Sequence, residues 1–304
     1  MQNLAQTLQI RGNLAESESY QRRALEAKRQ ALGEAHPSVT LSMNNLANLL
    51  TRQMDRLEEG EALARQALAG DRKTFGERHS YVAASLGNLG VILRLEGRFR
   101  EADSVLRQAL AMNREIYGEQ HQRVALNLGA LSLTRAAMGD GPEAIALMRR
   151  SLEVYRQTLG DDHRSTVTTM GNLAGVLAEF GDPVEAESLA RVALRGREVD
   201  QPERRVQVLN TELALGKAVL AQGRARESVP ILERVVARGR EQFGEGSWRT
   251  GDALLAYGLA LEAAGRREEA GLVLRAAAAA LDRNQSAQPR LAARARAEAA
   301  KLSR

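Results

Sequence analysis

The sequence predicts an all-α fold, a right-handed α-solenoid (superhelix) of seven antiparallel helix pairs. Three observations point to it. A stretch of 42 residues recurs along the chain, a glycine returns at the same place in nearly every copy, and small residues return at two further places. Each unit of such an array packs on its neighbours, so we expect one continuous repeat body over residues 1–282.

The unit from Gly76 to Tyr117 shows how one pair is built. Its first helix, here called helix A, has apolar residues at three- and four-residue steps: Val82, Leu86, Leu89 and Leu93. This spacing places them on one face of an amphipathic helix. Gly97 accepts the left-handed backbone that ends many helices. A second apolar stripe over residues 99–110 predicts helix B, and the short turn makes the two helices antiparallel.

Three repeat positions hold the same kind of residue throughout the chain. The turn inside each pair reads Gly12, Asp55, Gly97, Gly139, Gly181, Gly223 and Gly265. The small residue of helix B reads Ser17, Gly60, Ala102, Ala144, Ala186, Ser228 and Ala270. That of helix A reads Ala47, Gly90, Ser132, Ala174, Gly216 and Gly258. Because small side chains let two backbones approach closely, we predict that helices A and B touch at the last two positions.

This pattern resembles the tetratricopeptide repeat. The reference unit carries the bulky, small and glycine positions of that repeat at Leu86, Leu89, Gly90, Leu93, Ala102, Leu106 and Ala109. The usual repeat has about 34 residues, and the extra length here lies in helix B and in the connector after it. The longer form is similar to the repeats of kinesin light chain and of many bacterial scaffold proteins. The resemblance covers residues 1–282.

The units begin near residues 1, 33, 76, 118, 160, 202 and 244. The first is truncated, since Met1 corresponds to a position inside helix A. We therefore expect either that the chain is the C-terminal part of a longer polypeptide or that its first pair is frayed. Residues 283–304 follow the last unit as a basic, Ala/Arg-rich tail, which either forms a final helix that caps the stack or stays loose.

The positive charge of the chain is confined to that tail. The formal net charge is +5, and residues 283–304 hold six basic residues against Glu298, so residues 1–282 are balanced. We therefore expect no basic face for nucleic acid on the repeats. For the tail, contact with an acidic partner, nucleic acid or a membrane stays an alternative to a solvated end cap.

Composition narrows the class of protein further. There is no cysteine, so neither a disulfide framework nor a thiolate site can form. Residues 1–10 contain no charged n-region and no continuous apolar h-region, and no run of 18 apolar residues occurs, which predicts a cytoplasmic protein that does not enter a membrane. Arginine greatly outnumbers lysine and alanine is abundant, and this bias favours a bacterial source.

Histidine occurs four times, always three residues after the connector glycine: His36, His79, His121 and His163. A catalytic histidine has no reason to recur with the repeat, whereas a residue that starts helix A does. Copies on neighbouring helices would stand roughly 10 Å apart, which is too far to share one metal ion. We therefore predict a structural role for these histidines and no metal site.

No catalytic or cofactor motif accompanies the repeats. The sequence lacks a glycine-rich phosphate loop, a His-Glu-x-x-His motif and a Gly-x-Ser-x-Gly motif. Adjacent carboxylates, such as Asp161 and Asp162, fall where they interact with helix N-termini. We expect a protein that is not an enzyme and binds no cofactor.

Polar residues on helix A form the candidate site. One row holds asparagine in four units: Asn3, Asn45, Asn88 and Asn172. Three residues earlier, a second row holds small polar residues: Ser42, Ser85, Asn127 and Thr169. At 100° per residue, both rows lie beside the apolar stripe, so we expect them to be neither in the core nor on the far side of the helix.

The resemblance implies what these rows do. Helix A lines the concave wall of tetratricopeptide arrays, so both rows would pave a peptide-binding groove. In kinesin-light-chain-like repeats the matching asparagine holds the backbone of an extended peptide, a task that suits an amide because it offers both a donor and an acceptor. The alternative is that these asparagines cap or bridge neighbouring helices and bind nothing. Four arginines would either add charge selectivity or only be solvated: Arg52, Arg94, Arg123 and Arg249.

Taken together, the sequence predicts a protein-interaction scaffold that binds an extended peptide or partner segment in the groove lined by helix A. The alternative is a regulatory or sensor arm of a larger bacterial signalling protein, such as a kinase or an NTPase, whose catalytic domain lies outside this chain. Nucleic-acid binding is a third hypothesis, and the balanced charge of residues 1–282 argues against it.

Overall fold

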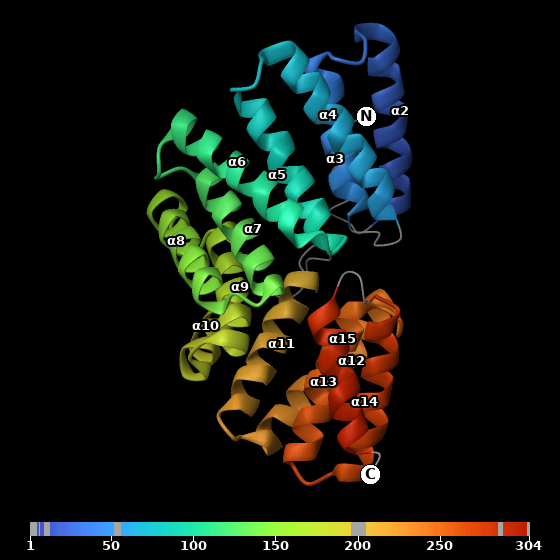
Figure 1. Ribbon diagram of the computed structural model, residues 1–304, viewed down its shortest axis with the longest axis vertical. Coiled ribbons are helices and arrows are strands. Elements are labelled where there is room, and N and C mark those ends of the chain that lie inside the picture. Colours follow the sequence, from blue (N-terminus) through green and yellow to red (C-terminus); the bar gives the residue numbers. More distant parts are fainter. Residues whose placement is uncertain are drawn as a thin grey trace. The chain divides into compact units, whose positions relative to one another are not determined.

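The computed structural model describes residues 5, 7–8, 13–51, 56–195, 205–284 and 288–302. The regular elements in these ranges are fourteen α-helices (Figure 1). This confirms the all-α helical-repeat class. In chain order the helices are α2 (Leu14–Leu32), α3 (Pro37–Leu50), α4 (Leu57–Phe75), α5 (Ser80–Leu95), α6 (Phe99–Tyr117), α7 (Gln122–Met138), α8 (Gly141–Leu159), α9 (Arg164–Phe180), α10 (Pro183–Arg195), α11 (Arg205–Ala221), α12 (Ala225–Phe243), α13 (Trp248–Ala263), α14 (Arg267–Asp282) and α15 (Pro289–Lys301).

The helices match the predicted pairs. Helix A of successive units is α3, α5, α7, α9, α11 and α13, and helix B is α4, α6, α8, α10, α12 and α14. In the first unit α2 is helix B, and most of the preceding residues lie outside the described ranges. After the last pair comes α15, so residues 289–301 of the tail form a helix, which packs on α14.

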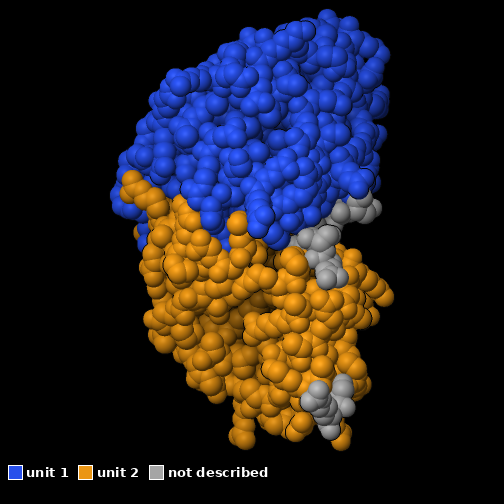
Figure 2. All heavy atoms as spheres, viewed as in Figure 1, with its two compact units in different colours: residues 1–135, 153–158, 199–204 blue, residues 136–152, 159–198, 205–304 orange. Residues whose placement is uncertain are grey.

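The chain divides into two compact units (Figure 2). Unit 1 comprises residues 1–135, 153–158 and 199–204, and unit 2 comprises residues 136–152, 159–198 and 205–304. In unit 1, a core of leucine, valine and alanine runs from Leu25 through Leu46 and Leu89 to Ala109. In unit 2, a second core runs from Leu209 to the alanines of α15. Each core grows by stacking neighbouring pairs, as expected of repeats.

Helices A and B approach most closely at the predicted small residues. Ser17 Oγ on α2 donates a hydrogen bond to the carbonyl oxygen of Ala5 at 2.7 Å, and Ser228 Oγ on α12 donates one to that of Gly216 on α11 at 2.9 Å. A Cβ built on Gly90 would lie 2.5 Å from Leu106 Cγ. One hydroxyl or one methyl therefore fills the whole space between the two backbones.

The glycines of the turns and connectors fall into two groups. Gly97, with φ of 81°, has the left-handed backbone predicted for the turn inside a pair. Gly181 differs, because its φ is −130°. A Cβ there would lie 2.6 Å from Leu177 Cδ2, so at Gly181 close packing, not backbone conformation, requires glycine. Two of the predicted turn residues, Gly12 and Asp55, lie outside the described ranges.

The four histidines are helix caps. In each connector the histidine Nδ1 accepts the backbone N–H two residues further on, for example that of Ser38 at 3.1 Å from His36 and that of Ser165 at 3.1 Å from His163. This satisfies one of the free N–H groups at the start of helix A. In the last repeat Ser247 is the cap of helix A, and its Oγ accepts a hydrogen bond from the backbone N–H of Arg249. The predicted structural role is confirmed.

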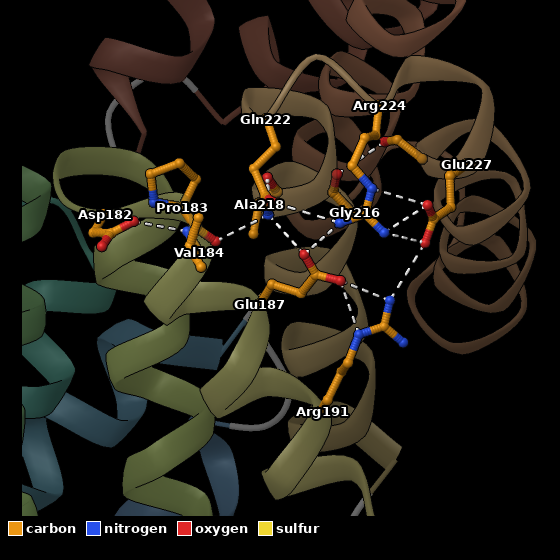
Figure 3. Close-up of polar contacts among 11 residues, drawn as sticks. Asp182, Pro183, Val184, Glu187, Arg191, Gly216, Ala218, Gln222, Arg224 and Glu227 are labelled. Carbon is orange, nitrogen blue, oxygen red and sulfur yellow. Dashed lines mark hydrogen bonds and ion pairs between the residues drawn. The ribbon is translucent and has the colours of Figure 1, made fainter.

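Ion-pair squares link one helix B to the next at three places within the ranges that the structure describes. Each square joins two glutamates to two arginines, and each arginine contacts both glutamates. The squares are Glu18, Arg22, Arg56 and Glu59; Glu61, Arg65, Arg98 and Glu101; and Glu187, Arg191, Arg224 and Glu227. Figure 3 shows the third, where Glu187 Oε2 also accepts from Gln222 Nε2 at 2.7 Å.

We predict that acid destabilises the chain through these squares. Partial burial alone would raise the pKa of Glu61, but hydrogen bonds from Arg65 and Arg98 outweigh it and hold the pKa below its usual 4.5. The pKa of Glu187 is lowered in the same way. A carboxyl whose pKa is lower in the folded state than in the unfolded state contributes stability above its unfolded pKa. That stability is lost as pH falls through the folded pKa.

The midpoint of thermal unfolding should therefore fall as pH drops below about 4.5, and Glu61→Gln should make that fall shallower. Calorimetry between pH 3 and pH 7 measures both. Glu115→Gln is the matched control, because Glu115 is exposed and Arg78 is its one ion-pair partner among the described residues. A profile for Glu61→Gln that superimposes on the wild type would contradict the prediction.

Candidate functional site

Within compact unit 1, helix A of three successive repeats presents an apolar and amide-bearing face to solvent. Its members recur at the same positions of α3, α5 and α7, three or four residues apart, and thus share one face of each helix. They are Leu41, Asn45, Asn48, Tyr81, Ala84, Asn88, Val91, Arg123, Leu126 and Ala130, and we call them the helix-A surface of unit 1. Three are large apolar side chains with high exposure: Leu41 at 45%, Tyr81 at 41% and Leu126 at 63%.

The asparagine row lies at this surface. Asn45 is exposed on α3, and Asn88 is half-buried on α5. In unit 2, Asn172 is half-buried on α9. Asn3 lies outside the described residues. Among the described residues, neither Asn45 nor Asn172 has a side-chain hydrogen bond, so their amides are open to solvent or to a ligand.

The second row is buried, which corrects the expectation that it stays out of the core. Ser42, Ser85, Asn127 and Thr169 are each at most 5% exposed. The reason is that helix A contacts its own helix B and also the pair before it, so that a second flank of the helix is covered. These residues therefore do not line a surface that a peptide can reach.

Instead, three members of the second row bond to polar residues on the preceding helix B, whereas Thr169 Oγ1 donates to the carbonyl oxygen of Ser165 in its own helix at 2.8 Å. Lys28 Nζ donates to Ser42 Oγ at 2.8 Å, Ser85 Oγ donates to Asp71 Oδ2 at 2.6 Å, and Asn113 Nδ2 donates to Asn127 Oδ1 at 2.5 Å. Each pair is fourteen residues apart in sequence. The sequence reasoning missed the helix-B members, and their recurrence at Lys28, Asp71 and Asn113 is the signal that would have found them.

A buried chain of hydrogen bonds leads from Asp71 to the surface. The Asp71 carboxylate, 1% exposed, also accepts from Thr40 Oγ1 at 2.6 Å. Asn44 Nδ2 donates to Ser85 Oγ at 2.7 Å, and Asn88 Nδ2 donates to Asn44 Oδ1 at 3.2 Å. The hydrogen bond to Asn44 uses the Nδ2 group of Asn88. The side-chain carbonyl oxygen of Asn88 remains as an acceptor at the helix-A surface of unit 1.

In compact unit 2, helix A of successive repeats presents a different, charged face. Lys217 Nζ on α11 contacts both carboxylate oxygens of Asp252 on α13, at 2.7 and 2.9 Å. The ring faces of Phe243 and Trp248 hold the Arg249 guanidinium at 5.1 and 4.7 Å, and burial lowers the Arg249 pKa. This arginine was expected, together with Arg52, Arg94 and Arg123, either to add charge selectivity or only to be solvated, and Arg52 lies outside the described residues.

Two further features of the described ranges bear on function. No helix among the described residues is long and apolar enough to cross a membrane. The same residues contain no group of three or more histidine or acidic side chains placed to hold a metal ion.

The repeats match known families. One tetratricopeptide repeat model matches residues 40–115, 81–140 and 122–198, and another matches residues 1–38. These ranges cover more than half of the chain, which therefore belongs to the tetratricopeptide repeat family. A sequence search of curated proteins finds no significant match.

Three solved structures show the same fold at low sequence identity. BtubC (BKLC) from P. vanneervenii is 18% identical with a TM-score of 0.58, over 76% of this chain and 92% of that one. A putative kinesin light chain from Podospora anserina, with nearly identical TPR-like repeats, is 24% identical with a TM-score of 0.53, over 68% and 98%. NprR in complex with its cognate peptide NprX is 14% identical with a TM-score of 0.58, over 97% and 83%.

Proposed function

We propose that this chain is a non-catalytic interaction scaffold that binds an extended peptide segment of a partner protein across the helix-A surface of unit 1. The observation that carries the proposal is that the exposed side chains of Leu41 and Leu126 share one face with the Asn88 amide, which a hydrogen bond to the buried Asn44 holds in place. Contiguous apolar groups rimmed by hydrogen-bonding groups are typical of surfaces that bind other proteins. NprR, which shares the fold, binds a peptide, and this supports the same class of ligand here.

The spacing of the repeats suits an extended peptide. Packed helices lie about 8–10 Å apart, and three residues of an extended chain span about 10 Å. A peptide that crosses α3, α5 and α7 in turn thus brings every third residue to an equivalent position. At one such position Ala84 stands between Leu41 and Leu126 in the repeat order, which leaves room for a bulky apolar side chain.

The asparagine row would hold the peptide backbone. The Asn88 carbonyl oxygen is available to accept a peptide N–H, while Asn44 fixes the other end of the amide. On α3 the exposed amide of Asn45 offers both a donor and an acceptor. We propose the same contact for Asn172 within unit 2, where it lies at the equivalent position of α9.

Truncating Asn88 tests the proposal. Peptides selected from a displayed random library against the wild-type chain should bind Asn88→Ala more weakly by about 1–3 kcal/mol, because a peptide group loses its partner on a surface that excludes water. Titration calorimetry measures the difference. Gln108→Ala on the exposed face of α6 is the matched control and should bind like the wild type. Equal affinity of all three chains would refute the role of Asn88.

A further inference from the structure

The last turns of α7 and α9 both belong to unit 2. Both contact the side chain of Arg290, which lies near the C-terminal end of the sequence. Arg290, in the first turn of α15, donates from Nη1 to the carbonyl oxygen of Ala136 at 2.8 Å. Its guanidinium carbon lies 5.1 Å from the centre of the Phe180 ring, and Nη1 lies 3.6 Å from Glu179 Oε1. Three different kinds of contact thus converge on one guanidinium.

These contacts fit the chemistry of a guanidinium closely. The last carbonyls of a helix carry partial negative charge and favour a cation. An aromatic face attracts a planar cation, and a carboxylate balances the positive charge of that cation. Gly139 belongs to the same site, because a Cβ built there would lie 3.3 Å from the Arg290 guanidinium carbon. Lysine could not stack on the ring and donate sideways to the carbonyl at once.

The Glu179 carboxylate lies in a crowded, partly buried setting. Burial raises its pKa, Asp252 raises it further, and Lys217, Arg290 and Arg294 oppose the shift. Charges in such a setting are less screened than charges fully in water, so the attraction between Glu179 and a cation is stronger there. The site therefore favours a positive group that keeps its charge at every physiological pH, as arginine does.

The remaining contacts of α15 are modest. Its buried residues are the alanines Ala292, Ala295 and Ala299, whose methyl groups remove little apolar area from water, and Leu291 and Leu302 are partly buried against the same core. The packing partner in the helical stack is α14. Release of the first turn of α15 therefore gives up the apolar contacts of Leu291 and Ala292, and Arg290 is the one polar tie between that turn and α7 or α9 among the described residues.

We propose that Ala136, Gly139, Glu179 and Phe180 form an arginine-binding site, which Arg290 occupies within the chain and which an arginine-bearing segment of a partner protein can enter when Arg290 leaves. The site lies in unit 2 and does not depend on peptide binding by unit 1. An intramolecular occupant competes at a high effective concentration. A partner arginine is therefore largely excluded until α15 is displaced.

The test uses the full-length chain and a pentapeptide with the sequence of residues 288–292, acetylated and amidated, observed by saturation-transfer NMR. Arg290→Ala should bind it at least about tenfold more tightly than the wild type, since the internal competitor is gone. The same peptide with lysine in place of arginine should bind Arg290→Ala about tenfold more weakly. Arg296→Ala is the matched control on the same helix, because in the described part of the chain Arg296 pairs with Asp282 alone, and it should behave like the wild type.

Adding Phe180→Leu to Arg290→Ala should abolish binding of the peptide. Equal binding by the wild type and Arg290→Ala, or binding that survives the loss of the Phe180 ring, would overturn the proposal. Should circular dichroism show that Arg290→Ala is unfolded, hydrogen exchange in the single variant Phe180→Leu decides. The proposal then requires faster exchange in the first turn of α15 than in the wild type, and unchanged exchange there rejects it.

Discussion

Ala102→Leu is expected to lower the free energy of unfolding by about 1–3 kcal/mol. Ala102 is fully buried where α6 meets α5. The hydrogen bonds of Ser17 and Ser228 at the same repeat position show that one small side chain already spans the gap there. Three additional heavy atoms can be accommodated only if the two helices move apart. Chemical denaturation followed by circular dichroism measures the change.

Ala84→Leu is the matched control for this substitution. It makes the same chemical change on α5, but at a position where neighbouring repeats carry the exposed leucines Leu41 and Leu126. Stability should change by less than about 0.5 kcal/mol, as for most surface substitutions. If the two variants lost the same stability, close packing at the small residues would not be what holds the pairs together.

Asp71→Ala is expected to cost about 2–4 kcal/mol of folding free energy. The carboxylate is buried and accepts hydrogen bonds from Thr40 and Ser85, two hydroxyls that have little access to water. Removing it takes the acceptor of the Ser85 hydroxyl, leaves Thr40 Oγ1 only its longer bond to the carbonyl oxygen of Pro37, and opens a small cavity. The loss should also loosen Asn44 and Asn88 at the far end of the chain of hydrogen bonds, so peptide affinity should fall together with stability.

Two further variants separate the effects at Asp71. Asp71→Asn should cost less, because an amide oxygen still accepts a hydrogen bond and the following repeat uses asparagine at this place, Asn113. In a double-mutant cycle, Ser85→Ala should cost less in the Asp71→Ala background than in the wild type, because the hydrogen bond between the two residues is already lost there. Fully additive costs would contradict a network held together by these bonds.

The sequence was sufficient for the fold because every structural requirement recurs. A stripe of apolar residues defines each helix, and the small residues at Gly90 and Ala102 mark where a pair closes. The histidine caps could be predicted for the same reason: a cap is required once per unit at a fixed distance from the connector glycine. Because the repeat recurs along the chain, each of these local requirements can be checked at several positions of the same sequence.

Burial of the second row could not be predicted from one helix alone. A helical projection places Ser85 beside the apolar stripe of α5, but it does not show that the preceding pair covers that flank. The partner of Ser85 lies on another helix, fourteen residues away. The contact of Arg290 with Ala136 was even less predictable from the sequence, because the two residues are 154 positions apart and do not occupy equivalent repeat positions.

The most direct test asks which face of unit 1 receives the peptide. A benzophenone amino acid is placed at position 126, on the helix-A surface of unit 1, or at position 116, on helix B, where Leu126 and Ile116 are 63% and 41% exposed. Each chain is then irradiated with a selected, labelled peptide. We predict cross-linking from position 126 and none above background from position 116. Capture from position 116 with none from position 126 would contradict the account.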